Sequence, residues 1–298
     1  MTEVIKNQKH AYIYAILSIL LWSTVASAFK ISLKHVDFIQ LLLYSSGTSA
    51  TVLFIILIFQ KKFSKIFTCS KKDYLMSVLL GFLNPFLYYT VLFKAYSILP
   101  AQEAQPLNYT WPLMLVLLSI PLLKQKIEVK SIFAIIISFT GVVIIGTGGN
   151  ILSMKFSNPF GMGLAVGSSV IWALFWIYNI KDKRDEVIKL FLNFLAGFIF
   201  TLILTVIYSK IILPDIRGVI GVIYVGLFEM GITFVLWLKA LKLSTTTDKV
   251  SNLVYFSPFI SLLFISFIVG EKILFSTITG LIFIISGVII QQYKNKTV

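Results

Sequence analysis

Ten long apolar stretches follow one another along this chain of 298 residues. Nine carry no charged side chain, and they cover residues 11–29, 38–59, 74–93, 104–123, 131–149, 156–180, 190–209, 250–270 and 273–293. The tenth, residues 218–238, carries a single acid, Glu229. A helix needs roughly 17–25 apolar residues to cross a bilayer, and it satisfies its own backbone hydrogen bonds there. We therefore predict an all-α integral membrane protein with ten transmembrane helices.

The composition leaves little room for a soluble domain. Hydrophobic residues make up 58% of the chain and charged residues 13%, so most of the surface must face lipid. The one cysteine, Cys69, lies in a basic loop and cannot form an intrachain disulfide. Ala26-Ser27-Ala28 resembles a signal-peptidase site, but the repeat described below predicts that this segment is kept as the first span.

Positive charge is distributed unevenly between the two sides of the predicted bundle. If the N-terminus is cytoplasmic, 19 of the 26 Lys and Arg residues fall in cytoplasmic segments. This is the positive-inside pattern, and it predicts a multi-pass protein of the cell membrane with both termini in the cytoplasm. The net charge of +14 therefore orients the chain, and we expect no nucleic-acid partner. The oligomeric state is left open, and a monomer is compatible with the pattern.

Short patterns of the first half recur in the second half. The offset is 145 residues around Gly81 and Lys94, which recur as Gly226 and Lys239. It is 146 residues for three further pairs, namely Leu107/Leu253, Tyr109/Tyr255 and Pro112/Pro258. We expect two units, residues 1–150 and residues 151–298, each with five helices. Because five is odd, the second unit must cross the membrane in the opposite sense. Such inverted repeats are typical of secondary transporters, which hold their substrate near the midplane between the repeats.

Three short strings resemble a known family. They are Leu21-Trp22-Ser23-Thr24, then Glu103 with Asn108-Tyr109-Thr110-Trp111-Pro112, and finally Tyr255-Phe256-Ser257-Pro258. They look like the EamA-like families of the drug/metabolite transporter superfamily, and most like the aromatic amino acid exporters. The resemblance implies ten helices in paired repeats, a central cavity for a small metabolite, and efflux of amino acids. The exporter pattern has an acid near the position of Asn84-Pro85, and its absence here leaves the substrate open.

Two prolines stand inside apolar stretches. A proline in a helix removes one amide donor and displaces the carbonyl four residues earlier, so we expect kinks that act in gating at Pro112 and Pro258. Freed carbonyls in lipid need protein or water as partners. We therefore predict that the residues beside the prolines line a polar cavity and bind substrate: Asn108, Tyr109 and Trp111, with Tyr255 and Ser257. A structural kink with packed aromatic rings is the alternative.

Glu229 is the one ionisable residue expected deep inside a span. An acid at the bilayer centre costs roughly 2.5–3.5 kcal/mol on insertion scales, so the side chain should face a cavity, where desolvation favours its neutral form. It either contacts a substrate ammonium or carries a coupling proton. A protonated carboxyl that bridges two helices is the alternative without function.

Other aromatic and acidic residues are weaker candidates. Trp22, Trp172 and Tyr88 are expected mid-span, where they line the cavity or pack in the core. Trp237 lies near a predicted span end, as interfacial tryptophans do. Glu103 is expected at the outer mouth of the fourth span, where it serves as a gate or simply stabilises a helix N-terminus.

Small residues predict where helices approach closely. Gly161, Gly163 and Gly167 lie in one span, the last two in GxxxG spacing, and Gly141 and Gly287 are repeat mates.

The pattern of residues favours transport over catalysis or conduction. An enzyme would need paired acids, histidines or an activated nucleophile within the spans, and the only histidines, His10 and His35, lie outside them. A channel would need rings of charge or carbonyls, which an inverted repeat with one acid fits poorly. We predict a secondary active transporter that works by alternating access, without metal or cofactor. It is driven by a substrate or ion gradient, with Glu229 a candidate proton carrier. Import or exchange of a nucleobase, an amine or a drug is the alternative.

Overall fold

A computed structural model describes residues 6–123, 129–153, 155–179, 182–245, 250 and 252–292. Within these ranges the regular secondary structure is helical, with loops between the helices and no strand. In the described part, six segments are long and apolar enough to cross a membrane: Gln8–Ser32, Phe38–Phe59, Lys71–Ile98, Pro159–Asn179, Glu186–Tyr208 and Ile216–Leu243. Shorter apolar helices lie at Ile132–Gly146, Leu253–Val269 and Phe275–Ile290. The prediction of an all-α integral membrane protein is confirmed.

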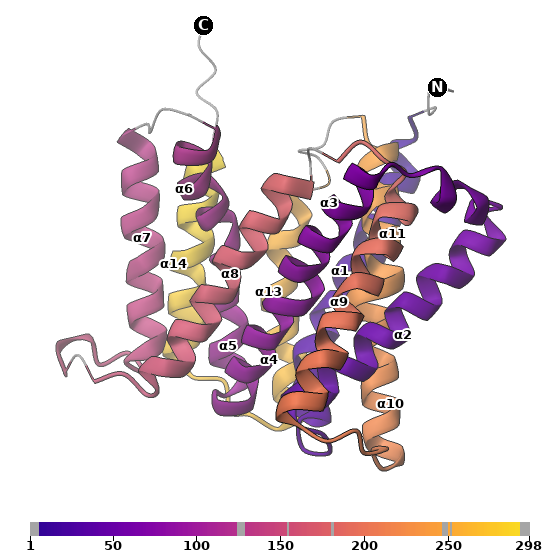
Figure 1. Cartoon of the computed structure of the whole chain (residues 1–298). Coiled ribbons are helices and arrows are strands. Elements are labelled where there is room, and N and C mark those ends of the chain that lie inside the picture. Colours follow the sequence, from indigo (N-terminus) through magenta and orange to yellow (C-terminus); the bar gives the residue numbers. More distant parts are fainter. Residues whose placement is uncertain are drawn as a thin grey trace, which may run out of the picture.

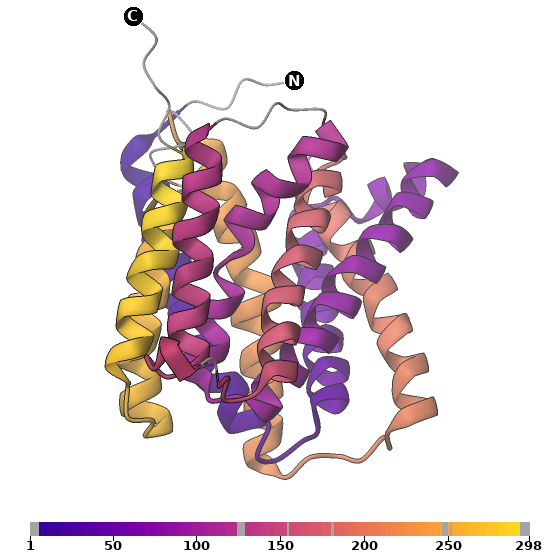
Figure 2. The same ribbon diagram turned by 90° about the vertical axis from the view of Figure 1, so that its left-hand side faces the viewer.

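The helices stand side by side across the molecule (Figures 1 and 2). The α1 helix begins, and the α14 helix ends, on one face, which we name the terminal face (Figure 1). The α-helices are α1 (Gln8–Ser32), α2 (Phe38–Phe59), α3 (Lys71–Gly81), α4 (Tyr88–Ile98), α5 (Ala101–Asn108), α6 (Trp111–Leu123), α7 (Val129–Gly146), α8 (Pro159–Asn179), α9 (Glu186–Tyr208), α10 (Ile216–Val225), α11 (Ile232–Leu243), α13 (Ser257–Phe264) and α14 (Phe275–Gln292). The chain ends themselves lie outside the described residues.

Polar side chains fix where several helices begin. Asp37, Asp185 and Asp215 accept hydrogen bonds from backbone N–H groups in the first turns of α2, α9 and α10. Ser70 and Asp73 form a capping box at the start of α3. Each cap satisfies donors that a helix leaves unpaired at its N-terminus. The caps also correspond between the halves, because Asp37 precedes Asp185 by 148 residues and Ser70 precedes Asp215 by 145.

Glycines allow close packing at some of the predicted positions. Gly141 and Gly287 lie where α7 and α14 meet, and an added Cβ would collide with Gly280 or with Ser138, so the prediction is confirmed for this pair. Gly161 also packs closely, since its Cβ would lie 2.8 Å from Leu99. The prediction is wrong for the GxxxG pair Gly163 and Gly167. A Cβ at either position would meet nothing within 4 Å, because these glycines do not face a neighbouring helix.

The predicted kink at Pro112 is instead a helix break, and at Pro258 the chain changes from a 3₁₀ to an α-helix. The α5 helix ends at Asn108, and α6 begins at Trp111 with Pro112 as its second residue. In the other half, a 3₁₀ segment, η5 (Asn252–Phe256), ends where α13 begins, and Pro258 is again the second residue of the new helix. The first turn of a helix has no intrahelical partner for its N–H groups, so a proline is tolerated there. The prediction was wrong at Pro112 because it assumed that one helix ran through this proline.

Two π-helical segments interrupt two other spans. Segment η2 (Phe82–Leu87) separates α3 from α4, and its Asn84 has extended backbone angles, φ −148° and ψ 119°. Segment η4 (Gly226–Gly231) separates α10 from α11 and contains Glu229. Asn84 and Glu229 are 145 residues apart, so they occupy corresponding positions in the two halves. Such π segments are frequent at functional sites, and these two place one amide and one acid at matching breaks.

Candidate functional site

A cavity of about 310 Å³ lies among α1, α4, α5, α6, α8, α11, η4 and η5. All five tryptophans of the chain line it: Trp22, Trp111, Trp172, Trp176 and Trp237. Four tyrosines join them: Tyr88, Tyr96, Tyr109 and Tyr255. The volume lies at the lower end of the range for small-molecule pockets, and aromatic walls with a few polar groups are typical of such sites.

Glu229 is the one acid in the cavity wall, and its residue is 8% exposed. Carboxyl oxygen Oε1 accepts a hydrogen bond of 2.9 Å from the Tyr89 hydroxyl of α4. The other oxygen, Oε2, has no partner among the described residues. The indole Nε1 of Trp22 donates a weak bond of 3.5 Å to the backbone carbonyl of Glu229. The carboxyl is therefore held on one side, and its second oxygen is buried without a hydrogen-bond partner among the described residues.

The matching position in the first half is chemically different. Asn84 is completely buried, and neither its Nδ2 nor its Oδ1 has a partner in the described part of the chain. The mate of Tyr89, again 145 residues on, is Phe234. One half thus combines an acid with a tyrosine hydroxyl, and the corresponding positions hold a neutral amide and a phenyl ring. The two halves supply one titratable carboxyl between them at these breaks.

Asn108 closes the end of α5 against two neighbouring helices. Its Oδ1 accepts a hydrogen bond of 3.2 Å from the Tyr88 hydroxyl of α4, and its Nδ2 donates one of 2.9 Å to Ser168 Oγ of α8. One turn earlier, Gln105 Oε1 accepts a bond of 2.7 Å from the Tyr96 hydroxyl. These amides hold the broken fourth span in place and already use much of their own hydrogen-bonding capacity.

The structure places eight of the predicted binding residues in the cavity wall. They are Trp22, Tyr88, Asn108, Tyr109, Trp111, Trp172, Glu229 and Tyr255. Ser257 lies outside the wall, where its hydroxyl is 3.2 Å from that of Ser23. The residues predicted to act in gating, Pro112, Pro258 and Glu103, do not line the cavity either.

Sequence reasoning missed several wall residues. Trp237 was expected at the membrane interface, yet it is buried and its ring centroid lies 5.4 Å from that of Trp22. Trp176 follows Trp172 by four residues, a spacing that puts both on one face of α8, and this signal could have found it. Gln105 and Tyr96 had no comparable signal.

A polar seal lies at the face opposite the terminal face. The carboxylate of Glu271 accepts hydrogen bonds from the backbone N–H groups of Ala101 and Gln102, at 2.8 and 3.0 Å, and so caps α5. Lys30 Nζ donates to the carbonyl oxygens of Tyr96 and Leu99 at the end of α4. These bonds hold the end of α1 against the end of α4, and the segment before α14 against the start of α5.

Glu103 belongs to the same end of the molecule. Its residue is 8% exposed, and Oε2 accepts a hydrogen bond of 2.8 Å from Ser157 Oγ, in the segment before α8. It lies in the first turn of α5, where the helix dipole favours a negative charge. The geometry thus gives Glu103 a stabilising contact between two helix ends.

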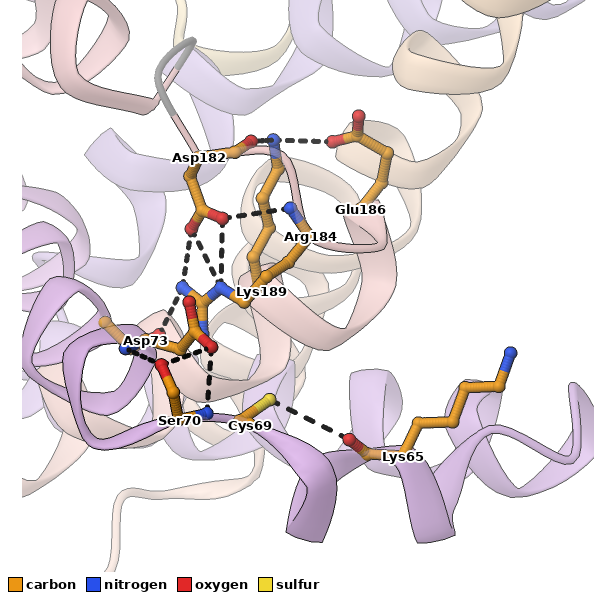
Figure 3. A network of polar contacts seen from close by, with 9 residues as sticks. Lys65, Cys69, Ser70, Asp73, Asp182, Arg184, Glu186 and Lys189 are labelled. Carbon is orange, nitrogen blue, oxygen red and sulfur yellow. Dashed lines mark hydrogen bonds and ion pairs between the residues drawn. The ribbon is translucent and has the colours of Figure 1, made fainter. Parts of the chain in front are cut away.

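An arginine held by an ion pair connects the two halves at the terminal face through a hydrogen bond. Arg184, just before α9, pairs with Asp182 at 2.5 Å and donates a bond of 2.8 Å to Ser77 Oγ of α3, beside the Ser70–Asp73 cap (Figure 3). Burial raises the pKa of Asp182, but the hydrogen bonds and charge of Arg184 outweigh this effect, so that the pKa lies below its ordinary value.

A related arrangement exists at the opposite face. Asp37, the cap of α2, accepts a bond of 2.6 Å from Ser209 at the end of α9. His35 lies 2.9 Å from Asp215, the cap of α10. Side chains of α3 and of the residues before α2 are thus bonded to side chains next to α9 and α10 in the other half.

With the fold and the cavity defined, comparison with known proteins identifies the family. The model of the EamA-like transporter family matches residues 9–147 and again residues 159–291. The chain belongs to the EamA-like transporter family. It is accordingly a multi-pass membrane protein and a transporter.

Relatives of this EamA-like transporter carry general names. An uncharacterized transporter of Clostridium kluyveri is 30% identical over 59% of this chain and 58% of its own length. One from Acidianus ambivalens is 28% identical over 78% of this chain and 88% of its own length, and YvbV of Bacillus subtilis is 27% identical over 75% and 72%. A solved crystal structure has the same fold, with a TM-score of 0.65 at 19% identity over 96% of this chain and 97% of its own.

Proposed function

We propose that the protein is a secondary transporter for small metabolites that carry an ammonium group on an aromatic or apolar body, a class that includes amino acids. The observation that carries the proposal is the free carboxyl oxygen of Glu229 in a cavity walled by tryptophan and tyrosine. The carboxyl supplies a partner for the ammonium, and the rings bury the rest of the substrate.

Alternating access follows from the arrangement of the breaks. In this proposal the chain forms ten spans in two inverted five-helix units, residues 1–150 and residues 151–298. The breaks at Asn108–Trp111 and at the start of α13 divide two spans into half-helices next to the cavity. The half-helices tilt while the ion pairs and hydrogen bonds at the two faces hold the remaining spans together. In this proposal the hydrogen bonds of Glu271 to the start of α5 break when the cavity opens to the outside.

A proton gradient is the proposed source of energy. An ionised carboxylate without a counter-charge is costly within a bilayer, so an empty cavity favours protonated Glu229. The hydroxyl of Tyr89 donates a hydrogen bond to the carboxyl, and the described wall of the cavity contains no basic side chain. Binding of an ammonium group would release the proton. The residue that corresponds to Glu229 in the other half is Asn84, so the segments η2 and η4 hold one acid between them. In this proposal that acid carries one proton per cycle.

The orientation in the membrane follows the distribution of charge. We propose that the terminal face is cytoplasmic, since the predicted loops on that side hold 19 of the 26 Lys and Arg residues. Efflux is the direction that the sequence resemblance implies, with the cell membrane as the location.

Counterflow in proteoliposomes tests the proposal. Liposomes are loaded with unlabelled tryptophan and tryptamine, and labelled tryptophan or labelled tryptamine is added outside. The compound that is carried should accumulate transiently, and Glu229→Gln should abolish this accumulation. The control is Glu186→Gln, which removes one carboxylate from the first turn of α9, away from the cavity. Uptake that does not depend on an internal substrate, or chemical conversion of the compound, would refute secondary transport.

A further inference from the structure

The charge of the cavity wall is one-sided. Glu229 is the acid in the wall, and the residues that line the cavity in the described part of the chain include no lysine, arginine or histidine. Two lysines that lie close to wall residues in the sequence, Lys30 and Lys239, make contacts elsewhere. Lys30 donates to backbone carbonyls at the seal, and Lys239 lies over the Tyr14 ring at 4.5 Å. The cavity therefore attracts a positive charge and offers no counter-charge to a negative one.

The aromatic rings suit a cation as well as an apolar body. Trp22 and Trp237 lie 5.4 Å apart between centroids and tilt by 59°, and Tyr88 lies 4.7 Å from Trp172 on the other side of the wall. The faces of such rings attract ammonium groups, most strongly in tryptophan, and cages of this kind bind quaternary ammonium ligands. A wall that contains all five tryptophans of the chain concentrates this attraction in one place.

A carboxylate would find no cationic partner among the described residues of the same cavity, whose donors are neutral, such as the indole N–H groups of the tryptophans. Both polar atoms of the Asn108 amide are already bonded. The helix starts beside the cavity offer little, because Pro112 and Pro258 have no N–H group and those of Leu113 and Met114 donate to the Thr110 carbonyl. Burial of an anion without partners is costly. The carboxylate of a bound amino acid would be buried in this cavity without a counter-charge.

We propose that the substrate is a monovalent organic cation, a protonated amine or quaternary ammonium with an aromatic or apolar body, and not an amino acid. This inference rests on the proposed transport function and narrows its substrate. Glu229 pairs with the cationic group, and the tryptophan and tyrosine rings enclose it and the body attached to it.

Ligands that share the indole ring system but differ in charge provide the test. Tryptamine and tryptophan methyl ester are cations, tryptophan is a zwitterion, and indole-3-propionate is an anion. Benzyltrimethylammonium adds a cation that cannot donate a hydrogen bond. Binding to the purified full-length protein is measured by calorimetry. Both indole cations should bind at least about tenfold more tightly than tryptophan, a difference of about 1.4 kcal/mol, and indole-3-propionate most weakly. Benzyltrimethylammonium should bind as well.

Variants separate the role of the carboxylate from that of the fold. Glu229→Gln should weaken tryptamine binding by about tenfold or more and remove the preference over tryptophan. Glu186→Gln should leave both unchanged. The wild-type ligand series remains decisive if Glu229→Gln fails to fold.

Three results are informative. Tryptophan binding as tightly as tryptamine, or failure of every cation in the series to bind, would overturn the assignment. Counterflow of tryptophan without tryptamine would overturn it while leaving secondary transport intact. Tight, Glu229-dependent binding of tryptamine without any counterflow would support the cation site and refute the transport function.

Discussion

Gly226 offers a quantitative test of how the break that holds Glu229 is packed. It is the first residue of η4, and it lies against α2. A Cβ added there would lie 2.6 Å from the carbonyl oxygen of Ser45 and 2.6 Å from the Cβ of Thr48. Ordinary van der Waals contacts to a Cβ begin at 3.4 Å, so α2 and η4 would have to separate by nearly 1 Å in Gly226→Ala.

The size of the effect follows from two opposing contributions. Overpacking costs about 1–3 kcal/mol, and a clash with backbone on one side and a branched side chain on the other belongs at the upper end. Alanine regains about 1 kcal/mol through its higher helix propensity. We therefore expect Gly226→Ala to lower the free energy of unfolding by about 2 kcal/mol. Gly163→Ala is the matched control, since its Cβ meets nothing within 4 Å and only the gain of up to about 1 kcal/mol applies.

Unfolding of purified protein in mixed micelles, titrated with a denaturing detergent, measures both variants. The two should differ by about 3 kcal/mol, with wild type between them. Gly226→Ala should also weaken tryptamine binding, because displacement of η4 moves the Glu229 carboxyl, whereas Gly163→Ala should not. Equal stability of the two variants, or a more stable Gly226→Ala, would refute the close packing of η4 against α2.

Three further predictions concern contacts at the site and at the terminal face. Tyr89→Phe removes the hydroxyl bonded to Glu229 and should destabilise the protein by about 1–3 kcal/mol in the same unfolding assay, and unchanged stability would contradict a role for this bond. Asn108→Ala removes the side-chain hydrogen bonds that join α5 to α4 and α8. It should weaken tryptamine binding about tenfold in calorimetry while the protein stays folded. Asp182→Asn removes the partner of Arg184 and should cost about 1–3 kcal/mol at neutral pH. Because folding lowers the pKa of Asp182, its contribution is present above the ordinary value near 4 and is lost as the pH falls through the folded value. The difference from wild type should shrink in acid, and a difference independent of pH would contradict this role.

Much of the candidate site could be predicted because polar groups are conspicuous in lipid. Glu229 and Asn108 stood out in apolar stretches, and the cost of exposing them to acyl chains predicted that they face a cavity. Trp237 could not be placed in the same way. A tryptophan near a span end is equally at home at the interface and in a wall, and only the rotation of α11 about its axis decides between them.

The sequence by itself determined that the chain is helical and crosses a membrane many times, because the transfer of long apolar stretches into lipid depends on composition and not on neighbours. It also determined that two similar halves exist. Only the tertiary structure decided that Pro112 and Pro258 begin new helices, that Gly163 faces no neighbouring helix, and that all five tryptophans meet around one carboxyl. These features depend on how each helix is rotated and packed against helices distant in the chain, and a residue's own chemistry does not specify that rotation.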